Sequence, residues 1–187
     1  MNETQDQVTI DQLMSPEEIK GLQVLTGAFM FGLFSFTLVV LFLFLNVAAP
    51  EPGPEELRNP GGGIEHLHLL SMVHAAVVLS SWTVGGFLYR RRTSRKALLS
   101  GSSNIREAFI LRLAFIEGPG LFGCVIFLLG AQGHVIDDFP LLWLNLLSPA
   151  ASIAFMGLTF PTKKNLERLP ALAATGTGSP WANRAEP

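Results

Sequence analysis

One carboxylate stands inside a long apolar segment of this sequence. Glu117 occurs in LAFIEGPGLFG, residues 113–123, where Gly118, Pro119 and Gly120 follow it. It lies roughly 13 Å along a helix from the start of the apolar segment, and an ionised acid in the middle of a bilayer costs about 3 kcal/mol. We therefore expect Glu117 to keep its proton and to face protein rather than lipid, where it could hold a proton, a water or a small cation.

Prolines near the same depth release backbone acceptors. Because a proline nitrogen carries no hydrogen, Pro119 leaves the carbonyl of Phe115 without its helical partner, and Pro149 releases the carbonyl of Asn145. Serines of the neighbouring apolar segments fall at the depth of Glu117 when residues are counted from the segment ends. The sequence therefore predicts an intramembrane polar seam formed by Glu117, Pro119, Ser81, Asn145, Ser148 and Ser152.

Three uses of this predicted seam stay open at this point. A neutral Glu117 would make it a set of hydrogen bonds between packed helices, whereas a titrating Glu117 would make it a proton or cation site. The seam could also recognise a partner subunit or a lipid. The first use predicts a structural or accessory membrane subunit, and the second predicts a proton- or cation-handling membrane protein.

Other reactive side chains do not form a motif. Haem ligation would need two histidines that face each other, but no histidine lies opposite His74, the deepest of the four. Cys124 is the single cysteine, which excludes a disulfide within the chain and a zinc motif. The net charge of −2 gives no basic face for nucleic acid. We expect no enzyme activity, no cofactor, no metal and no nucleic-acid partner.

Four apolar blocks must position these residues. The chain is 49% hydrophobic and 15% charged, whereas soluble domains carry about 25% charge, and each block is long enough to cross a bilayer as a helix. The first block opens with MSPEEI, where Ser15 and Glu18 predict a capping box around Pro16. The predicted fold class is all-α, a polytopic membrane protein with an antiparallel four-helix transmembrane bundle.

The predicted boundaries follow from the same blocks. One transmembrane domain is expected over residues 15–169, between a tail of residues 1–14 and a disordered tail of residues 170–187. The four helices are expected at about 16–49, 66–90, 106–132 and 139–161.

Basic residues predict the orientation in the membrane. They gather in the connection between the second and third blocks and again after the fourth, while the other two connections carry almost none. The positive-inside rule then puts both termini in the cytoplasm. The second connection is also expected to contact lipid headgroups through Arg90, Arg91, Arg92, Arg95 and Lys96.

The third block and the end of the fourth also resemble a known group. ILRLAFIEGPGLFGCVIFLL and FPTKKNLERL are similar to small, functionally uncharacterised bacterial membrane proteins with four helices. The matching positions are Arg112, Glu117, Gly118, Pro119, Phe122, Gly123 and Pro161 to Lys163. The third block is also weakly similar to the carboxylate-bearing helix of the proteolipid c subunit of rotary ATP synthases, which has two helices rather than four. Neither resemblance implies an activity for this chain.

The expected setting is a multi-pass protein of the bacterial inner membrane. Its expected partners are the lipid bilayer and either another membrane protein or a second copy of the chain. A topology reporter tests the orientation directly. A reporter fused after Pro187 should be active only as a cytoplasmic fusion, since the basic connections hold both termini on that side. Periplasmic activity of the same fusion would overturn the predicted orientation.

Overall fold

The chain is helical throughout the part that the structure describes. The computed structural model describes residues 13–46, 60–94, 103–133, 135–136 and 139–174. Its helices are α2 (Pro16–Asn46), α3 (Pro60–Arg92), α5 (Ser103–Gln132), the 3-10 helix η2 (Pro140–Leu146), α6 (Leu147–Leu158) and α7 (Lys163–Ala174). Four spans, with η2 and α6 together forming the last one, are long and apolar enough to cross a membrane. The predicted all-α fold class and four-helix bundle are confirmed.

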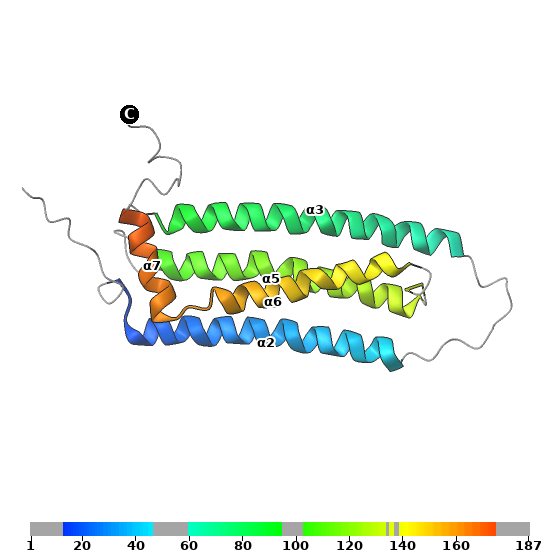
Figure 1. Cartoon of the computed structure of the whole chain (residues 1–187), viewed down its shortest axis with the longest axis horizontal. Helices are drawn as coiled ribbons and strands as arrows, with labels where there is room; N and C mark the ends of the chain where they lie inside the picture. Colours follow the sequence, from blue (N-terminus) through cyan, green and yellow to red (C-terminus); the bar gives the residue numbers. More distant parts are fainter. Residues whose placement is uncertain (1–12, 47–59, 95–102, 134, 137–138, 175–187) are drawn as a thin grey trace, which may run out of the picture.

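Helix α5 is the central element of the bundle. It packs against α3, α2 and α6, and consecutive spans run in opposite directions along the long axis (Figure 1). The two helices that enter from the same end, α2 and α5, are therefore parallel. Helix α7 lies across one end of the bundle, which we call the α7 end.

The outer surface is apolar, as expected for a protein surrounded by lipid. Large side chains such as Phe31, Leu45 and Met72 are exposed on α2 and α3. In water such a surface would be unfavourable, but in a bilayer lipid tails cover it, and helices there associate through close packing and hydrogen bonds. The contacts in the interior of the bundle therefore hold the four spans together.

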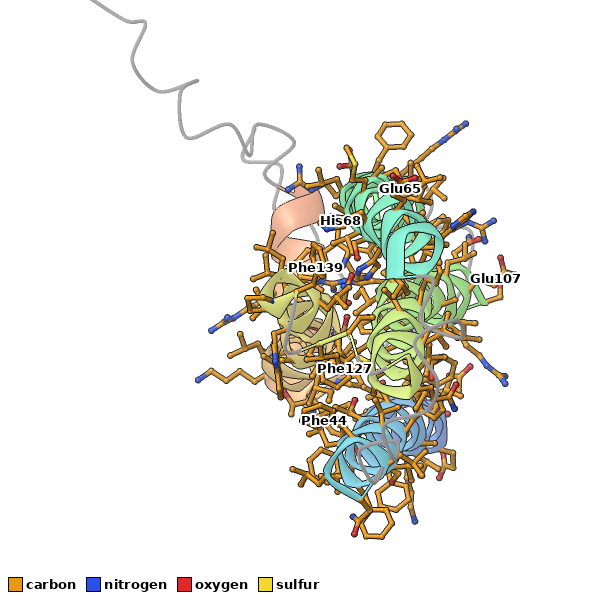
Figure 2. The ribbon with its side chains drawn as sticks, turned by 90° about the vertical axis from the view of Figure 1, so that its right-hand side faces the viewer. Phe44, Glu65, His68, Glu107, Phe127 and Phe139 are labelled. Carbon is orange, nitrogen blue, oxygen red and sulfur yellow. The ribbon has the colours of Figure 1, made fainter. Side chains whose placement is uncertain are left out.

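Apolar side chains fill the interior in three clusters. At the α7 end, Leu166 of α7 packs with Met14, Leu22, Ile105 and Phe109. The middle cluster contains Leu33, Leu113, Ile116 and Met156. The far end is aromatic, and Figure 2, which looks along the bundle from that end, shows Phe127 of α5 and Phe44 of α2 meeting there.

Helices α3 and α5 are in close contact where α3 carries a glycine. A Cβ added to Gly85 would lie 2.8 Å from Cβ of Phe115, so no larger residue fits without moving a helix. The neighbouring Gly86 has nothing within 4 Å of the same position. Gly85 thus lets α3 lie against α5.

The helix ends match the predictions in part. The capping box is present, since the Ser15 amide donates to Glu18 and the Glu18 amide donates to Oγ of Ser15. The second helix begins at Pro60 rather than 66, and the fourth ends at Leu158 rather than 161. Helix α7 was not predicted and continues to Ala174, past the expected end of the domain at 169. Of the predicted tails, residues 1–14 and 170–187, the parts over 1–12 and 175–187 lie outside the described residues.

Candidate functional site

A buried imidazole lies at the centre of the bundle. His74, in the middle of α3, is only 4% exposed. Its Nδ1 lies 2.8 Å from Oδ1 of Asn145, and its Nε2 lies 3.0 Å from the carbonyl oxygen of Pro119. The edge of the ring meets Phe122 with the ring centroids 5.6 Å apart. One side chain therefore joins α3 to both α5 and η2.

The contacts of Asn145 fix one proton of this imidazole. Nδ2 of Asn145 donates to the carbonyl of Leu142 at 3.1 Å and to Oγ of Ser71 at 3.0 Å. Since a carbonyl only accepts hydrogen bonds, the amide nitrogen must face Leu142, and Oδ1 must face His74. Oδ1 also only accepts, so Nδ1 of His74 carries a hydrogen.

Ser148 supplies a hydroxyl with several acceptors in reach. Its Oγ lies 2.9 Å from Nε2 of His74, 3.2 Å from the carbonyl of Pro119 and 3.1 Å from the carbonyl of Asn145. The Asn145 carbonyl is the one that Pro149 deprives of its helical partner. Ser148 can therefore donate to the imidazole or to a free carbonyl, depending on whether Nε2 carries a hydrogen.

Ser152 extends the polar contacts toward the α7 end. Its hydroxyl donates to the carbonyl of Ile116 at 2.8 Å, near the proline inside α5. Among the described residues, every buried side-chain nitrogen and oxygen has a hydrogen-bond partner. We call the set of Ser71, His74, Asn145, Ser148 and Ser152, with their acceptors on α5, the polar centre.

A glycine on α5 makes room for the polar centre. A Cβ at Gly123 would overlap the carbonyl oxygen of Asn145 and the hydroxyl of Ser148, and it would lie 2.8 Å from Cε1 of His74. Only the absence of a side chain lets α3, α5 and α6 meet at this point. Gly123 is thus as necessary to the site as the polar residues themselves.

The predicted seam needs a correction, because the structure does not bring Glu117 into the polar centre. Phe115 and Pro119 face α3, where they contact Gly85 and His74. Glu117 is two residues from each, which turns it about 200° around the helix, to the opposite side. It is partly buried there. Within the described residues Glu117 has no hydrogen bond and no ion pair.

Ser81 also lies outside the polar centre. It is on α3 one turn before Gly85, and Gly85 faces Phe115 of α5. Ser81 therefore lies on the side of α5 opposite to Glu117. Of the predicted seam, the structure brings Pro119, Asn145, Ser148 and Ser152 together, as the hydrogen bonds described above show. His74 takes the place that the prediction gave to Glu117.

His74 could have been found from the sequence by a different comparison. It is a polar residue in an apolar span, and Ser71 and Ser81 fall three and seven residues from it, which places all three on one helical face. Counting depth from segment ends does not show which face a residue occupies. The absence of a histidine opposite His74 excludes haem ligation, but it says nothing about asparagine and serine as hydrogen-bond partners of His74.

Arg112 of α5 has aromatic neighbours. Its guanidinium carbon lies 4.3 Å from the ring centre of Tyr89 and 4.7 Å from that of Phe155. These distances are within the range of cation–π attraction. Arg112 therefore ties α3, α5 and α6 together near the α7 end, and no ion pair between Arg112 and Glu117 is present.

The predicted headgroup contacts lie at the α7 end. Arg90 and Arg91 are exposed at the end of α3. Arg92 forms an ion pair with Glu107 of α5, so its guanidinium already has a partner on the protein surface. Arg95 and Lys96 lie outside the described residues.

Comparisons with known proteins give no further guide to the site. No protein-family model, no curated protein and no solved structure matches the chain. The resemblance in the third helix therefore stays a prediction. Within the described residues there is no group of three or more His, Cys, Asp or Glu side chains that could hold a metal ion.

Two glycines of α5 provide a matched test of the polar centre. Gly123→Ala should lower the free energy of unfolding by about 2 kcal/mol or more, because the added methyl overpacks a rigid contact between three helices. Gly118→Ala should leave it unchanged or raise it by up to about 1 kcal/mol, since nothing lies within 4 Å of the new Cβ and alanine favours the helix more than glycine does. Reversible unfolding in mixed detergent micelles, followed by circular dichroism, measures both. Equal stability of the two variants would contradict the packing around His74.

Proposed function

We propose that this chain is a structural or accessory subunit of a membrane assembly. The observation that carries this proposal is the closed polar centre. Its buried donors and acceptors are matched to one another across α3, α5, η2 and α6, so the hydrogen bonds hold the helices in one arrangement. A matched network of this kind gives a membrane bundle a unique packing, because no water competes for its members.

The surroundings of the polar centre also favour a structural role. Toward the α7 end it is bordered by the apolar cluster of Leu33, Leu113, Ile116 and Met156. Toward the far end the cluster around Phe127 and Leu142 covers it. Apolar packing on both sides separates the buried polar groups from water, which suits a fixed hydrogen-bonded core better than a path for ions.

The setting that we propose is the bacterial inner membrane, with both termini in the cytoplasm. The exposed Arg90 and Arg91 lie at the α7 end, and so does Lys164 of α7. Basic side chains gathered at one end of a bundle are typical of the cytoplasmic face. The α7 end would then lie at the anionic headgroups of the inner leaflet.

The assembly role can be tested on the native membrane and on the purified chain together. Extracted in mild detergent, the chain should run in a particle larger than its own oligomer and contain a second membrane protein at a fixed ratio. Reconstituted alone in liposomes with a pH gradient, it should give no proton flux above that of empty liposomes. Recovery of the chain alone, together with proton flux, would contradict the structural role.

A second candidate function is proton response, and the position of His74 favours it. Its Nδ1 donates to Asn145, while its Nε2 faces both the Pro119 carbonyl and the Ser148 hydroxyl. A neutral ring accepts from Ser148, whereas a charged ring donates to Pro119 and lets Ser148 turn to the Asn145 carbonyl. Each protonation state thus has a complete set of partners, which is unusual for a buried group.

The described contacts of the His74 ring include no acidic or basic side chain. The contacts of its ring with α5 and η2–α6 are to Pro119, Phe122, Asn145 and Ser148, none of which is charged. Glu117 lies on the opposite side of α5. A change of charge at His74 would therefore act on the hydrogen bonds of the polar centre rather than on an ion pair.

Nitrogen NMR of histidine-labelled chain in lipid nanodiscs tests the proton response. If the ring responds to protons, acidification should add a signal from an Nε2 that carries a hydrogen to the signal from one that does not. Ser148→Ala removes the donor to the neutral ring, so the form with a hydrogen on Nε2 should gain population relative to wild type under the same conditions. Ser152→Ala serves as the control and should leave the two populations as in wild type. A single form of His74 that does not change on acidification would exclude the proton response.

A further inference from the structure

Glu117 is a polar group in the apolar middle of α5 that the bundle does not use. It is the fifteenth residue of a helix that runs from Ser103 to Gln132, so it lies near the midpoint of the span. The polar centre is on the other side of α5. The partial exposure of Glu117 leaves its carboxyl accessible at the surface of the bundle.

Among the described residues, no cation lies at this depth on that side. Helix α2, which packs against α5, has no Asp, Glu, Lys, Arg or His from Gly21 to Asn46, and α6 has none from Leu147 to Leu158. On α5 the nearest base is Arg112, whose guanidinium lies between Tyr89 and Phe155. Cys124 shares the face of Glu117 but is hydrogen-bonded to Thr37 of α2. A carboxyl in such surroundings is expected to be neutral.

The surface around Glu117 is shaped for a close neighbour. Ala114 and Gly118 are exposed next to it, and nothing lies within 4 Å of a Cβ built on Gly118. Two small residues four positions apart let the backbone of another membrane helix come near. Glu117 would then reach a partner without being stretched away from its own helix.

We propose that Glu117 is a self-association site, in which two copies of the chain pair through their Glu117 carboxyl groups. A neutral carboxyl has one O–H donor and one carbonyl acceptor, so two of them form a cyclic pair with two hydrogen bonds. Each O–H donates to the C=O of the other copy, and no further group is needed. The site is incomplete in one chain and complete in two.

Membrane topology favours a second copy over other occupants. Two copies inserted with the same orientation are related by an axis along the membrane normal, as in common two-fold oligomers. This symmetry puts both Glu117 residues at the same depth. A helix of another protein would have to bring a donor to that depth, and a lipid tail offers none. The self-complementary carboxyl therefore selects a second copy.

The inference deepens the proposed assembly role by naming one partner of the subunit. It rests on that role only in that both treat the chain as part of an assembly. The test below uses purified chain, in which no second protein is present. Failure of self-association would leave an assembly with another protein standing, and the absence of such an assembly would leave self-association standing.

The experiment measures association of the full-length chain in liposomes. Copies labelled at the C-terminus with donor and acceptor dyes are mixed over a range of protein-to-lipid ratios, and energy transfer gives the dissociation constant. Wild type should associate, and Glu117→Leu should weaken association at least tenfold, because leucine offers no hydrogen bond. Glu117→Gln should associate within about threefold of wild type, since an amide also carries a donor and an acceptor.

Two controls separate this site from other causes. Glu107→Gln removes an exposed acid of the same helix and should not change association. Raising the pH should dissociate wild type once the carboxyl ionises, because two carboxylates repel, and should leave Glu117→Gln unchanged. Helical content and thermal unfolding of each variant confirm that it folds.

Several results would overturn the proposal. The first is association of Glu117→Leu as strong as that of wild type, and the second is a wild type that stays monomeric at every ratio. Association of wild type that resists high pH as fully as Glu117→Gln would also count against the carboxyl pair. If wild type stays monomeric but binds an added polyleucine helix carrying one central lysine, the partner is a basic helix and not a second copy.

Discussion

Three backbone carbonyls in the middle of the bundle, those of Ile116, Pro119 and Asn145, accept hydrogen bonds from side chains. The Asn145 carbonyl loses its helical partner to Pro149, whereas those of Ile116 and Pro119 lie inside α5 and gain side-chain hydrogen bonds in addition. In a bilayer no water can satisfy the Asn145 carbonyl or the buried side chains that contact these carbonyls, so the protein must do it. The hydroxyls of Ser148 and Ser152 and the imidazole of His74 find their partners at these three carbonyls and at Asn145. The same contacts that satisfy the carbonyls hold the helices together.

This constraint explains why α5 lies at the centre. It presents the carbonyls of Ile116 and Pro119 on the side that faces α3 and α6, and Gly123 lets those two helices come close to them. On the α2 side the pair of Thr37 and Cys124 lies among apolar contacts such as that of Leu33 with Gly120. Glu117 lies at the edge of that second side. One helix thus carries a satisfied polar face and, nearly opposite, a carboxyl group that has no partner among the described residues.

The four spans could be predicted well from the sequence because long blocks of apolar residues determine them. Residues in long apolar blocks cannot be covered by so little polar chain, and the capping box at Ser15 marks a helix start by local chemistry alone. Helix α7 was not predicted because it is short and polar on average. It forms where Leu166 packs into an apolar cluster. Such a helix depends on tertiary contacts that local pattern does not contain.

The polar centre was predicted in part, for a physical reason. Pro149 predicts a free backbone carbonyl, and the serines of α6 predict hydrogen-bond donors that could pair with such an acceptor. The rotation of α5 about its own axis cannot be predicted in this way. Every side of α5 is apolar enough for either protein or lipid, so the sequence gives no preference for the face of Glu117 over the face of Pro119. The glycines decide it, since only Gly123 allows α3 and α6 to meet at His74.

The contact of Leu166 with the ends of α2 and α5 has a consequence for how the protein is made. Leu166 is fully buried between residues that are translated long before it, among them Met14, Leu22 and Ile105. Until the ribosome has released α7, this apolar cluster lacks its cover at the membrane surface. The spans can insert one by one, but the bundle closes only after α7 has been translated. Nascent chains that stop before residue 166 would present an open hydrophobic site to chaperones and proteases.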